Sequence, residues 1–278
     1  MGCQGGSCDS KKNQSLENHP CFSPQGHGKT GRIHLPVAPG CNISCGYCVR
    51  KFDCANESRP GVTSRVINPE QALWRVEKAL SGPLGDALAV VGIAGPGEPL
   101  ANPHTYETLR LVKEKYPHMM LCVSSNGLLL SEKVEELKEI GISHITVTLN
   151  SLRAETGEQI YPYVFWQGKK LTGQEGAGLL IEKQLQGIEE ASKLGLLVKV
   201  NTVVIPGIND GQIEEIALKV KSLGAAVLNL MPLINQGIFA DLEPPSVLEM
   251  TKHRHKVSAI LPQIAHCRQC RADAIGLI

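Results

Sequence analysis

The sequence predicts an α/β fold: a partial (β/α)6 TIM-like barrel with irregular N- and C-terminal extensions over the barrel mouth. Two observations predict it. Short apolar runs alternate with amphipathic stretches from Arg32 to Met231, which is typical of parallel strands joined by helices. A cysteine-rich loop, rather than the glycine fingerprint of a dinucleotide-binding sheet, follows the first apolar run.

Six apolar runs are the predicted strands. They are short, rich in Val, Ile and Leu, and bounded by Gly, Pro, Asn or Ser, as strands commonly are. The runs cover residues 32–38, 88–95, 120–125, 144–150, 197–205 and 226–232.

Amphipathic stretches between these runs are the predicted helices. Asn68 and Asn102 each precede a proline, so each is expected to cap a helix that begins at that proline. Ser131 is expected to begin a third helix that ends at Gly141. Further helices are predicted within residues 179–195, 211–224 and 245–261.

The chain divides into three predicted parts. Residues 32–232 form the barrel, and residues 1–31 and 233–278 form the two extensions. Neither extension is long enough to bury a core of its own. Both are therefore expected to pack across the mouth of the barrel, where barrel enzymes carry their chemistry.

Composition excludes several classes of function. The 28 basic and 27 acidic residues give a net charge of +1, which leaves no basic surface for nucleic acid. No apolar stretch approaches the roughly 20 residues of a transmembrane helix, and the first residues lack the apolar core of a secretory signal. We expect a soluble cytoplasmic protein that binds neither nucleic acid nor membrane.

Cys41, Cys45 and Cys48 place three thiols in the segment CNISCGYC. Without a secretory signal, metal ligation explains such thiols better than disulfides do. A structural zinc or an ordinary cluster needs a fourth protein ligand. Three thiols on one loop therefore predict an iron–sulfur cluster with one open iron, and a zinc loop or structural thiols are the alternative.

Two further sets of residues lie at predicted strand ends. In GIAGPGEPL, Gly95 and Gly97 allow close approach of backbone to a ligand, and Glu98 supplies a carboxylate for an ammonium group. Polar side chains at other strand ends are candidates for cofactor binding, although ordinary loop capping explains any single asparagine equally well. These candidates, with a neighbouring methionine, are Ser124, Asn126, Asn150, Asn201, Asn229 and Met231.

Together the cysteine loop and the GPGEP segment resemble the radical S-adenosylmethionine (SAM) superfamily. The resemblance implies that Cys41, Cys45 and Cys48 hold a 4Fe–4S cluster whose open iron chelates the amino and carboxylate groups of SAM. It also implies that the segment containing Glu98 grips the SAM amino group. One electron from the cluster would then cleave SAM to methionine and a 5′-deoxyadenosyl radical.

The chain has more cysteines than a single SAM-binding cluster requires. If both extensions fold over the barrel mouth, these thiols could converge and hold one or two further clusters. A C-x2-C pair with one distant cysteine suits iron–sulfur or zinc. Cys122 has the alternative of a small buried residue, and His34 that of a satisfied core histidine. The additional candidate ligands are Cys21, His34, Cys54, Cys122, Cys267 and Cys270.

Segments along nearly the whole chain, including HPCFSP, CVRKFDCANESRPGVTS and CRQCRADA, resemble the radical SAM family that builds the nitrogenase cofactor. The resemblance implies a carbide synthase that fuses two 4Fe–4S clusters into an 8Fe–9S–C precursor. One SAM would methylate a cluster sulfide, and a second would yield the radical that abstracts hydrogen from that methyl group. A sulfite-derived sulfur would complete the core. Many members continue into a carrier domain, so the resemblance is to the stand-alone form.

The same resemblance implies ligand sets and partners. Cys21, His34 and Cys54 would hold one substrate cluster, and Cys122, Cys267 and Cys270 the other. Glu57 would act in catalysis, as an oxygen ligand or a proton acceptor. The implied partners are SAM, an iron–sulfur cluster donor, an electron donor such as ferredoxin or flavodoxin, and downstream nitrogenase cofactor assembly or carrier proteins.

Two alternatives stay open. A radical SAM maturase with auxiliary clusters, acting on a peptide or small molecule, would share the barrel and the first cluster but should show a recognition domain or a peptide groove. An iron–sulfur scaffold or electron carrier would neither bind nor cleave SAM.

Overall fold

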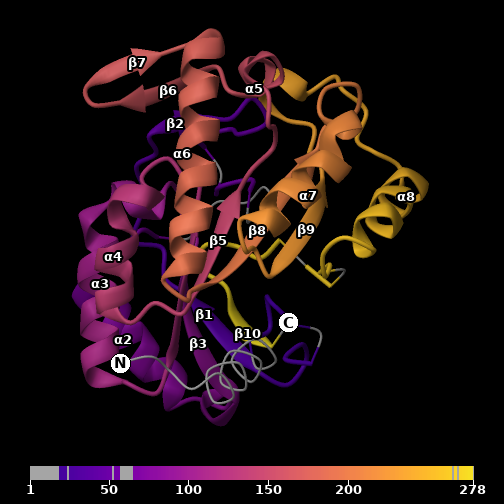
Figure 1. The fold of residues 1–278 in the computed structure, drawn as a ribbon. Coiled ribbons are helices and arrows are strands. Elements are labelled where there is room, and N and C mark those ends of the chain that lie inside the picture. Colours follow the sequence, from indigo (N-terminus) through magenta and orange to yellow (C-terminus); the bar gives the residue numbers. More distant parts are fainter. Residues whose placement is uncertain are drawn as a thin grey trace.

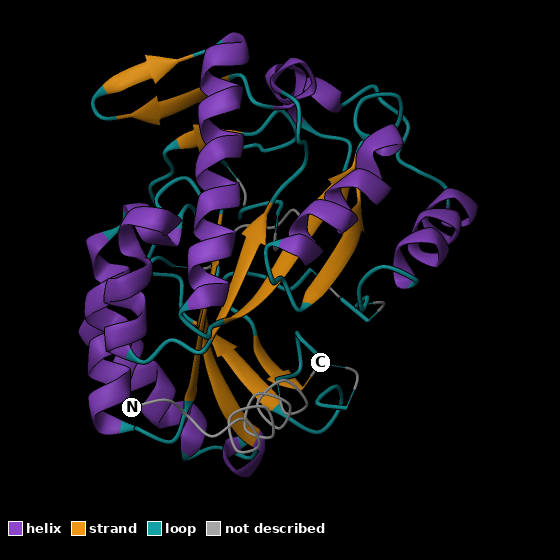
Figure 2. Cartoon of the chain, viewed as in Figure 1, coloured by secondary structure: helices purple, strands orange, loops and turns teal. Residues whose placement is uncertain are grey.

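Six parallel strands form one curved sheet in the computed structural model (Figures 1 and 2). The sheet runs in the order β1-β3-β4-β5-β8-β9, with β10 added outside β1. It is open between β9 and β10, so the predicted partial (β/α)6 barrel is confirmed. The structure describes residues 19–23, 25–51, 53–56, 65–264, 266–267 and 269–277. Glu57 lies outside these residues.

The predicted strands are all present among the described residues. The first is shorter than expected, since its ladder ends at His34 and the chain continues in an extended form. The parallel strands are β1 (Gly31–His34), β3 (Leu88–Ile93), β4 (Met120–Ser125), β5 (His144–Thr148), β8 (Leu197–Val204) and β9 (Val227–Pro232).

Helices follow the strands and cover the outer side of the sheet (Figure 1). Most of their buried apolar residues join those of the strands in one large core, whereas Ile160 and Leu180 belong to a second cluster that contains Cys45 and Tyr47. The helices are α2 (Pro69–Leu80), α3 (Pro103–Lys115), α4 (Leu130–Ile140), α5 (Ala154–Ile160), α6 (Gly173–Lys193), α7 (Ile213–Ser222) and α8 (Val247–Ser258). Short 3-10 turns are η1 (Gly85–Ala87), η2 (Pro99–Ala101), η3 (Asp210–Gln212) and η4 (Gly237–Phe239).

Helix starts agree with the sequence in part. Asn68 caps α2 through a capping box with Gln71, and Gly141 ends α4 with a left-handed φ of 96°. Asn102 stands before α3, but its side chain makes no cap and instead bonds Gly40 and the Glu98 carbonyl. Ser131 lies inside α4 and does not begin it. The Asn102 prediction was wrong because its side chain makes tertiary contacts instead of a cap. The Ser131 prediction was wrong because α4 begins one residue earlier, at Leu130.

Three strand pairings were not predicted. A second small sheet joins β2 (Ile43–Ser44) to the hairpin of β6 (Tyr163–Trp166) and β7 (Lys169–Leu171). It holds the cysteine loop against the end of α5. β10 (Ile275–Leu277) pairs antiparallel with β1, so the end of the chain is tied to the sheet edge.

Alternation along the strands separates two faces of the sheet. Successive side chains of a strand point to opposite faces. In β4, Leu121 joins the core under the helices, whereas Cys122 and Ser124 line cavities on the inner face. In β8, Val198 joins the core and Lys199 lines the same inner face. The inner face therefore carries the polar and thiol side chains.

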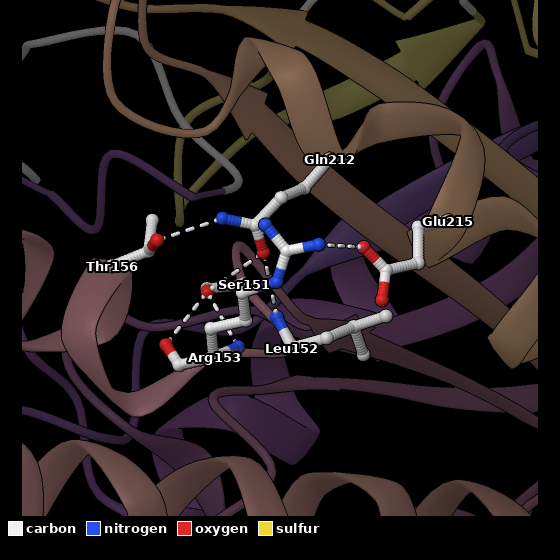
Figure 3. A network of polar contacts seen from close by, with 6 residues as sticks. All are labelled: Ser151, Leu152, Arg153, Thr156, Gln212 and Glu215. Atoms are coloured by element: carbon white, nitrogen blue, oxygen red, sulfur yellow. Dashed lines mark hydrogen bonds and ion pairs between the residues drawn. The ribbon is translucent and has the colours of Figure 1, made fainter.

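A polar network fixes the loop after β5 to the start of α7 (Figure 3). The Gln212 side chain accepts from Ser151 Oγ at 3.2 Å and donates to Thr156 Oγ1 at 2.7 Å. Arg153 adds an exposed ion pair with Glu215 at 2.6 Å. These contacts are structural and hold the carboxyl end of β5 in place.

Candidate active site and metal centres

The cysteine loop is clamped by backbone on both sides. Gly46 donates its N–H to the Ile160 carbonyl at 2.7 Å, and its own carbonyl accepts from Ile238 at 2.8 Å. A turn brings Cys48 N to the Cys45 carbonyl at 3.0 Å. The loop thus has one defined shape at the carboxyl end of β1.

The GPGEP segment is a second clamp on this loop. Gly97 N donates to the Ala38 carbonyl at 2.5 Å, and Glu98 N donates to the Gly40 carbonyl at 2.7 Å. A Cβ at Gly97 would stand 2.1 Å from the Gly40 carbonyl oxygen. Gly95 adopts a φ of +133°, which L side chains rarely adopt. The close approach that these glycines allow is an approach to the cysteine loop itself.

The Glu98 carboxylate organises the end of β4. Its Oε1 accepts from Ser125 Oγ at 2.7 Å and from Leu100 N at 3.0 Å, and its Oε2 accepts from Asn126 N at 2.6 Å. Burial nevertheless raises the pKa of this carboxyl to about 7, because desolvation disfavours the charge more than these donors favour it.

A cavity of about 440 Å³, which we call the loop cavity, opens beside the three thiols. Its lining residues are Cys41, Ile43, Cys45, Cys48, Arg50, Cys54, Asn56, Ala94, Gly97, Glu98, Ser124, Ser125, Asn126 and Thr148. Amide groups face two sulfurs: Asn56 Nδ2 lies 3.8 Å from Cys45 Sγ, and Asn126 Nδ2 lies 4.0 Å from Cys41 Sγ.

The residues of the loop cavity fit an iron–sulfur cluster. Three thiols and N–H donors to sulfur are the set that such clusters use. Burial raises the pKa of the Cys41 thiol to about 11, with the Glu98 carboxylate adding to the shift. Burial also raises the pKa of Cys45 and Cys54. Without metal these thiols stay protonated, so iron must displace protons to bind.

Several predicted polar residues support the loop from behind. Tyr47 donates to Asn56 Oδ1 at 2.5 Å and accepts from Asn150 Nδ2 at 2.7 Å. Asn201 Nδ2 donates to the Asn56 carbonyl at 3.1 Å, and Asn229 Nδ2 donates to Asn201 Oδ1 at 3.1 Å. Asn150, Asn201, Asn229 and Met231 are buried beneath the loop cavity and are not among its described lining residues.

A second cavity of about 570 Å³, the inner cavity, lies on the concave face of the sheet. It brings together residues from the head, the sheet and the tail of the chain. Its lining residues are His19, Pro20, Cys21, Phe22, Arg32, His34, Ile93, Ala94, Cys122, Val123, Ser124, Thr146, Lys199, Ile264, His266, Cys267, Gln269 and Cys270. Head and tail contact each other here, since His266 Nε2 lies 2.8 Å from the Pro20 carbonyl.

His34 and Cys122 face one point across Gly92. The three residues share one row of the sheet, in β1, β4 and β3 respectively. A Cβ at Gly92 would lie 2.8 Å from Cys122 Sγ and 3.4 Å from His34 Nε2. His34 Nδ1 lies 3.1 Å from the Arg271 carbonyl, an acceptor that fixes the proton on Nδ1 and leaves the Nε2 lone pair for a metal. Burial, aided by Arg32, lowers the pKa of His34 to about 3, so the ring is neutral.

The two cavities adjoin. Ala94 and Ser124 line both of them. Ser124 Oγ is buried and has no hydrogen-bond partner among the described residues. The cysteine loop and the inner cavity are thus separated by small side chains.

Comparison with known proteins identifies the family. The Radical SAM superfamily model matches residues 35–220. FeMo cofactor biosynthesis protein NifB of Methanocaldococcus infernus is 44% identical over 271 residues, which cover 97% of this chain and 88% of that protein. The chain belongs to the NifB family of radical SAM proteins.

Other NifB relatives are longer. The protein of Chlorobaculum tepidum is 47% identical over 267 residues, and that of Klebsiella pneumoniae 44% identical over 268 residues. The chain covers 62% and 57% of their respective lengths, although the matches cover 95% and 94% of this chain. It therefore spans little more than half of these NifB proteins.

Solved structures support the fold of this NifB-family chain. A radical SAM methyltransferase from Sphaerobacter thermophilus matches with a TM-score of 0.65 and 20% identity, over 88% of this chain and 72% of that one. Streptococcus suis SuiB matches with a TM-score of 0.62 and 13% identity, over 94% and 54% of the two chains. At these identities the likeness concerns the fold alone.

The structure distributes the predicted ligands of this NifB-family chain over the two cavities. Cys21, His34, Cys122 and the Cys267/Cys270 pair line the inner cavity, and Cys54 lines the loop cavity beside Cys48. Cys54 thus lies apart from the two residues with which it was grouped. In the described part of the chain, no trio of Cys, His, Asp or Glu side chains stands close enough to hold a single metal ion. No described helix is long and apolar enough to cross a bilayer.

Sequence reasoning missed several residues of these cavities. Tyr47 and Asn56 hold the cysteine loop, and their place between ligands was an available signal. Arg32, Lys199 and His19 line the inner cavity. Charged residues at inward positions of otherwise apolar strands could have revealed Arg32 and Lys199.

Glu98 is expected to make the metal-free protein less stable as pH rises. Its pKa is about 7 in the folded chain against an ordinary 4.5. Between these values the folded chain keeps a proton that the unfolded chain has lost, so the free energy of unfolding falls with rising pH. The loss is about 3 kcal/mol. Urea denaturation at pH 4.5 and 7 should show this difference in the wild type and a smaller one in Glu98→Gln. If the free energy of unfolding changed equally with pH in both proteins, the prediction would be wrong.

Proposed function

We propose that the chain is a radical SAM enzyme that fuses two 4Fe–4S clusters into the 8Fe–9S–C precursor of the nitrogenase iron–molybdenum cofactor. One observation carries the proposal: four cysteines and a neutral histidine, from head, sheet and tail, line a single cavity next to the SAM-type cysteine loop. A barrel with only the loop cavity would have room for SAM chemistry but no place for a cluster substrate. The printed name of the relatives, FeMo cofactor biosynthesis protein, agrees with it.

The loop cavity binds the cofactor and SAM in this proposal. Cys41, Cys45 and Cys48 hold a 4Fe–4S cluster, which when bound supplies one electron that cleaves SAM to methionine and a 5′-deoxyadenosyl radical. Arg50, whose Nη2 donates to the Pro39 carbonyl at 2.6 Å, places a cation at the rim, where it can pair with the SAM carboxylate. Glu98 positions Asn126, and a further hydrogen bond to its carboxylate would orient the SAM ammonium group.

The inner cavity holds the substrate. Cys21, His34, Cys122, Cys267 and Cys270 are the ligands of the two clusters, and Cys54 completes the set from the adjoining cavity. Clusters held by few protein ligands are suited to leave as product. The neutral His34 ring can detach without leaving a buried anion behind, which favours release over permanent binding.

Group transfer crosses the boundary at Ala94 and Ser124. One SAM donates its methyl group to a cluster sulfide and leaves as S-adenosylhomocysteine. A second SAM supplies the radical that takes a hydrogen atom from that methyl group and leaves as 5′-deoxyadenosine. Loss of the two remaining hydrogens as protons leaves carbide, and sulfite, reduced by the electron donor, supplies the ninth sulfur. Small side chains at this boundary keep the donor and the acceptor close.

The proposal requires partners that supply and consume these species. They are an iron–sulfur cluster donor, an electron donor such as ferredoxin or flavodoxin, and a carrier or nitrogenase assembly protein that accepts the product.

Anaerobic reconstitution tests the function. The full chain should bind about twelve irons, as three 4Fe–4S clusters require. With SAM and reductant it should form both S-adenosylhomocysteine and 5′-deoxyadenosine, and its product should activate a cofactor-deficient nitrogenase. SAM cleavage with no activating product would contradict the function and favour a different radical SAM reaction.

His34→Ala is expected to spare SAM cleavage and to weaken cluster conversion. The variant loses a ligand of the inner cavity but leaves the loop cavity intact. Since loss of a partner in a metal site costs about 10- to 100-fold, product formation should fall by that factor while 5′-deoxyadenosine stays near the wild-type rate. His104→Ala, at an exposed position in α3, is the control. An equal loss of both activities would contradict the role of His34.

A further inference from the structure

Two buried cations face the inner cavity. Arg32 extends from β1 and Lys199 from β8, and each side chain is only 3% exposed. Both line the cavity that holds Cys21 and Cys267. Nε and Nη1 of Arg32 have no hydrogen-bond partner among the described residues. A guanidinium stays charged at any ordinary pH, so these two N–H groups are donors without an acceptor.

A third donor lines the same cavity. His19 is fully buried and lines the cavity. Its Nδ1 lies 3.1 Å from Cys21 N and accepts that backbone hydrogen bond, which puts the ring proton on Nε2. Nε2 is buried without a hydrogen-bond partner in the described residues. His19 therefore offers an N–H donor and, in this tautomer, no metal ligand.

Countercharge is missing from the lining. None of the described residues that line the inner cavity is Asp or Glu. The Asp273 carboxylate, which raises the pKa of His34, forms an ion pair with Arg271 at 3.0 Å. Lys199 Nζ donates to the Cys21 carbonyl at 3.4 Å, whereas Nε and Nη1 of Arg32 are buried without an acceptor among the described residues, which is costly for a charged group. This arrangement favours an anion in the cavity.

We propose that Arg32, Lys199 and His19 form an anion-binding shell that holds the iron–sulfur substrate by N–H donation to its sulfides. The inference rests on the proposed function and adds how that substrate is recognised. Thiolate-ligated iron–sulfur clusters are anions, and hydrogen bonds to their sulfurs together with nearby positive charge stabilise the reduced form. Donation to sulfide does not depend on which irons keep their cysteines. The shell can therefore retain the core while protein ligands exchange.

The test isolates the clusters of the inner cavity. In the full chain, the triple variant Cys41→Ala, Cys45→Ala, Cys48→Ala removes the loop cluster, so iron bound after anaerobic reconstitution reports on the remaining ligands. Arg32→Met is added to this background, with Arg32→Lys as the conservative variant. Arg110→Met is the matched control, because Arg110 lies in an exposed ion pair with Glu136. Iron content, the midpoint potential by redox titration, and the Tm of the metal-free protein are measured.

Opposite effects in the two forms are expected for Arg32→Met. The metal-free protein should gain thermal stability, because an uncompensated buried charge is gone. In the reconstituted protein, reduction of the clusters should become at least tenfold less favourable, which lowers a one-electron midpoint potential by about 59 mV. Alternatively, the variant should bind less iron, and Arg32→Lys should restore the iron content. Arg110→Met should leave the Tm of the metal-free protein, the midpoint potential and the iron content unchanged.

Two failures are distinguishable. A triple variant that binds no iron would overturn the proposed function and, with it, the shell. A triple variant that binds iron, with unchanged potential and iron content in Arg32→Met, would overturn the shell alone. A lower Tm of metal-free Arg32→Met together with an unchanged potential would show a purely structural arginine.

Discussion

Cys45→Ala is expected to abolish 5′-deoxyadenosine formation. Cys45 is the most deeply buried of the three loop thiols, and Asn56 faces its sulfur at 3.8 Å. In the proposed function Cys45 is one of the three cluster ligands, so its loss leaves the cluster without a stable site. The rate should fall by more than about 100-fold, because even an outer partner of a metal ligand is worth about 10- to 100-fold. Anaerobic assay of 5′-deoxyadenosine with SAM and dithionite measures it.

Cys122→Ala is the control for this experiment. Cys122 lies on β4 in the inner cavity, away from the loop thiols. Its loss should leave SAM cleavage near the wild-type rate while the iron content falls. Substantial SAM cleavage by Cys45→Ala would show that the loop cavity is not the site of that reaction.

Gly97→Ala should destabilise the protein and disorganise the cysteine loop. The added Cβ would lie 2.1 Å from the Gly40 carbonyl oxygen and 2.9 Å from that of Ala38. Both atoms are backbone, so no side chain can swing away. The clash would separate the two clamped segments at a cost of about 3 kcal/mol or more, and the hydrogen bond from Glu98 N to Gly40 would be lost with it. Urea denaturation gives the stability change, and SAM cleavage should fall as well.

Gly211→Ala is the matched control. Gly211 has an ordinary φ, and nothing lies within 4 Å of a Cβ built there. It should leave stability and SAM cleavage unchanged. If Gly97→Ala behaved like Gly211→Ala, the clamp between the GPGEP segment and the cysteine loop would not govern the site.

The fold could be predicted from the sequence because its signals are local. Each strand is a short apolar run, and Asn68-Pro69 carries its own capping chemistry. The site could be predicted in part for the same reason. Cys41, Cys45 and Cys48 lie on one loop, so their spacing alone indicates the ligand set.

Long-range contacts set the rest, and a single sequence does not show them. Asn102 has the residue type of a cap, yet its side chain bonds Gly40, which is 62 residues away. Cys54 was expected to share a cluster with Cys21 and His34, but it lines the loop cavity beside Cys48. Arg32 and Lys199 meet one cavity only because β1 and β8 curve around the same space. No pattern along either strand states that meeting.

The contact between His266 and Pro20 has a consequence for how the side chains of the inner cavity are held. His34 and Cys122 stand on strands whose ladders hold them rigidly, whereas the other thiols of this cavity belong to the two end segments. Those two segments are hydrogen-bonded to each other as well as to the sheet, so the positions of their thiols are coupled. The side chains of this cavity therefore form two groups, one held by the strand ladders and one held where the two end segments meet.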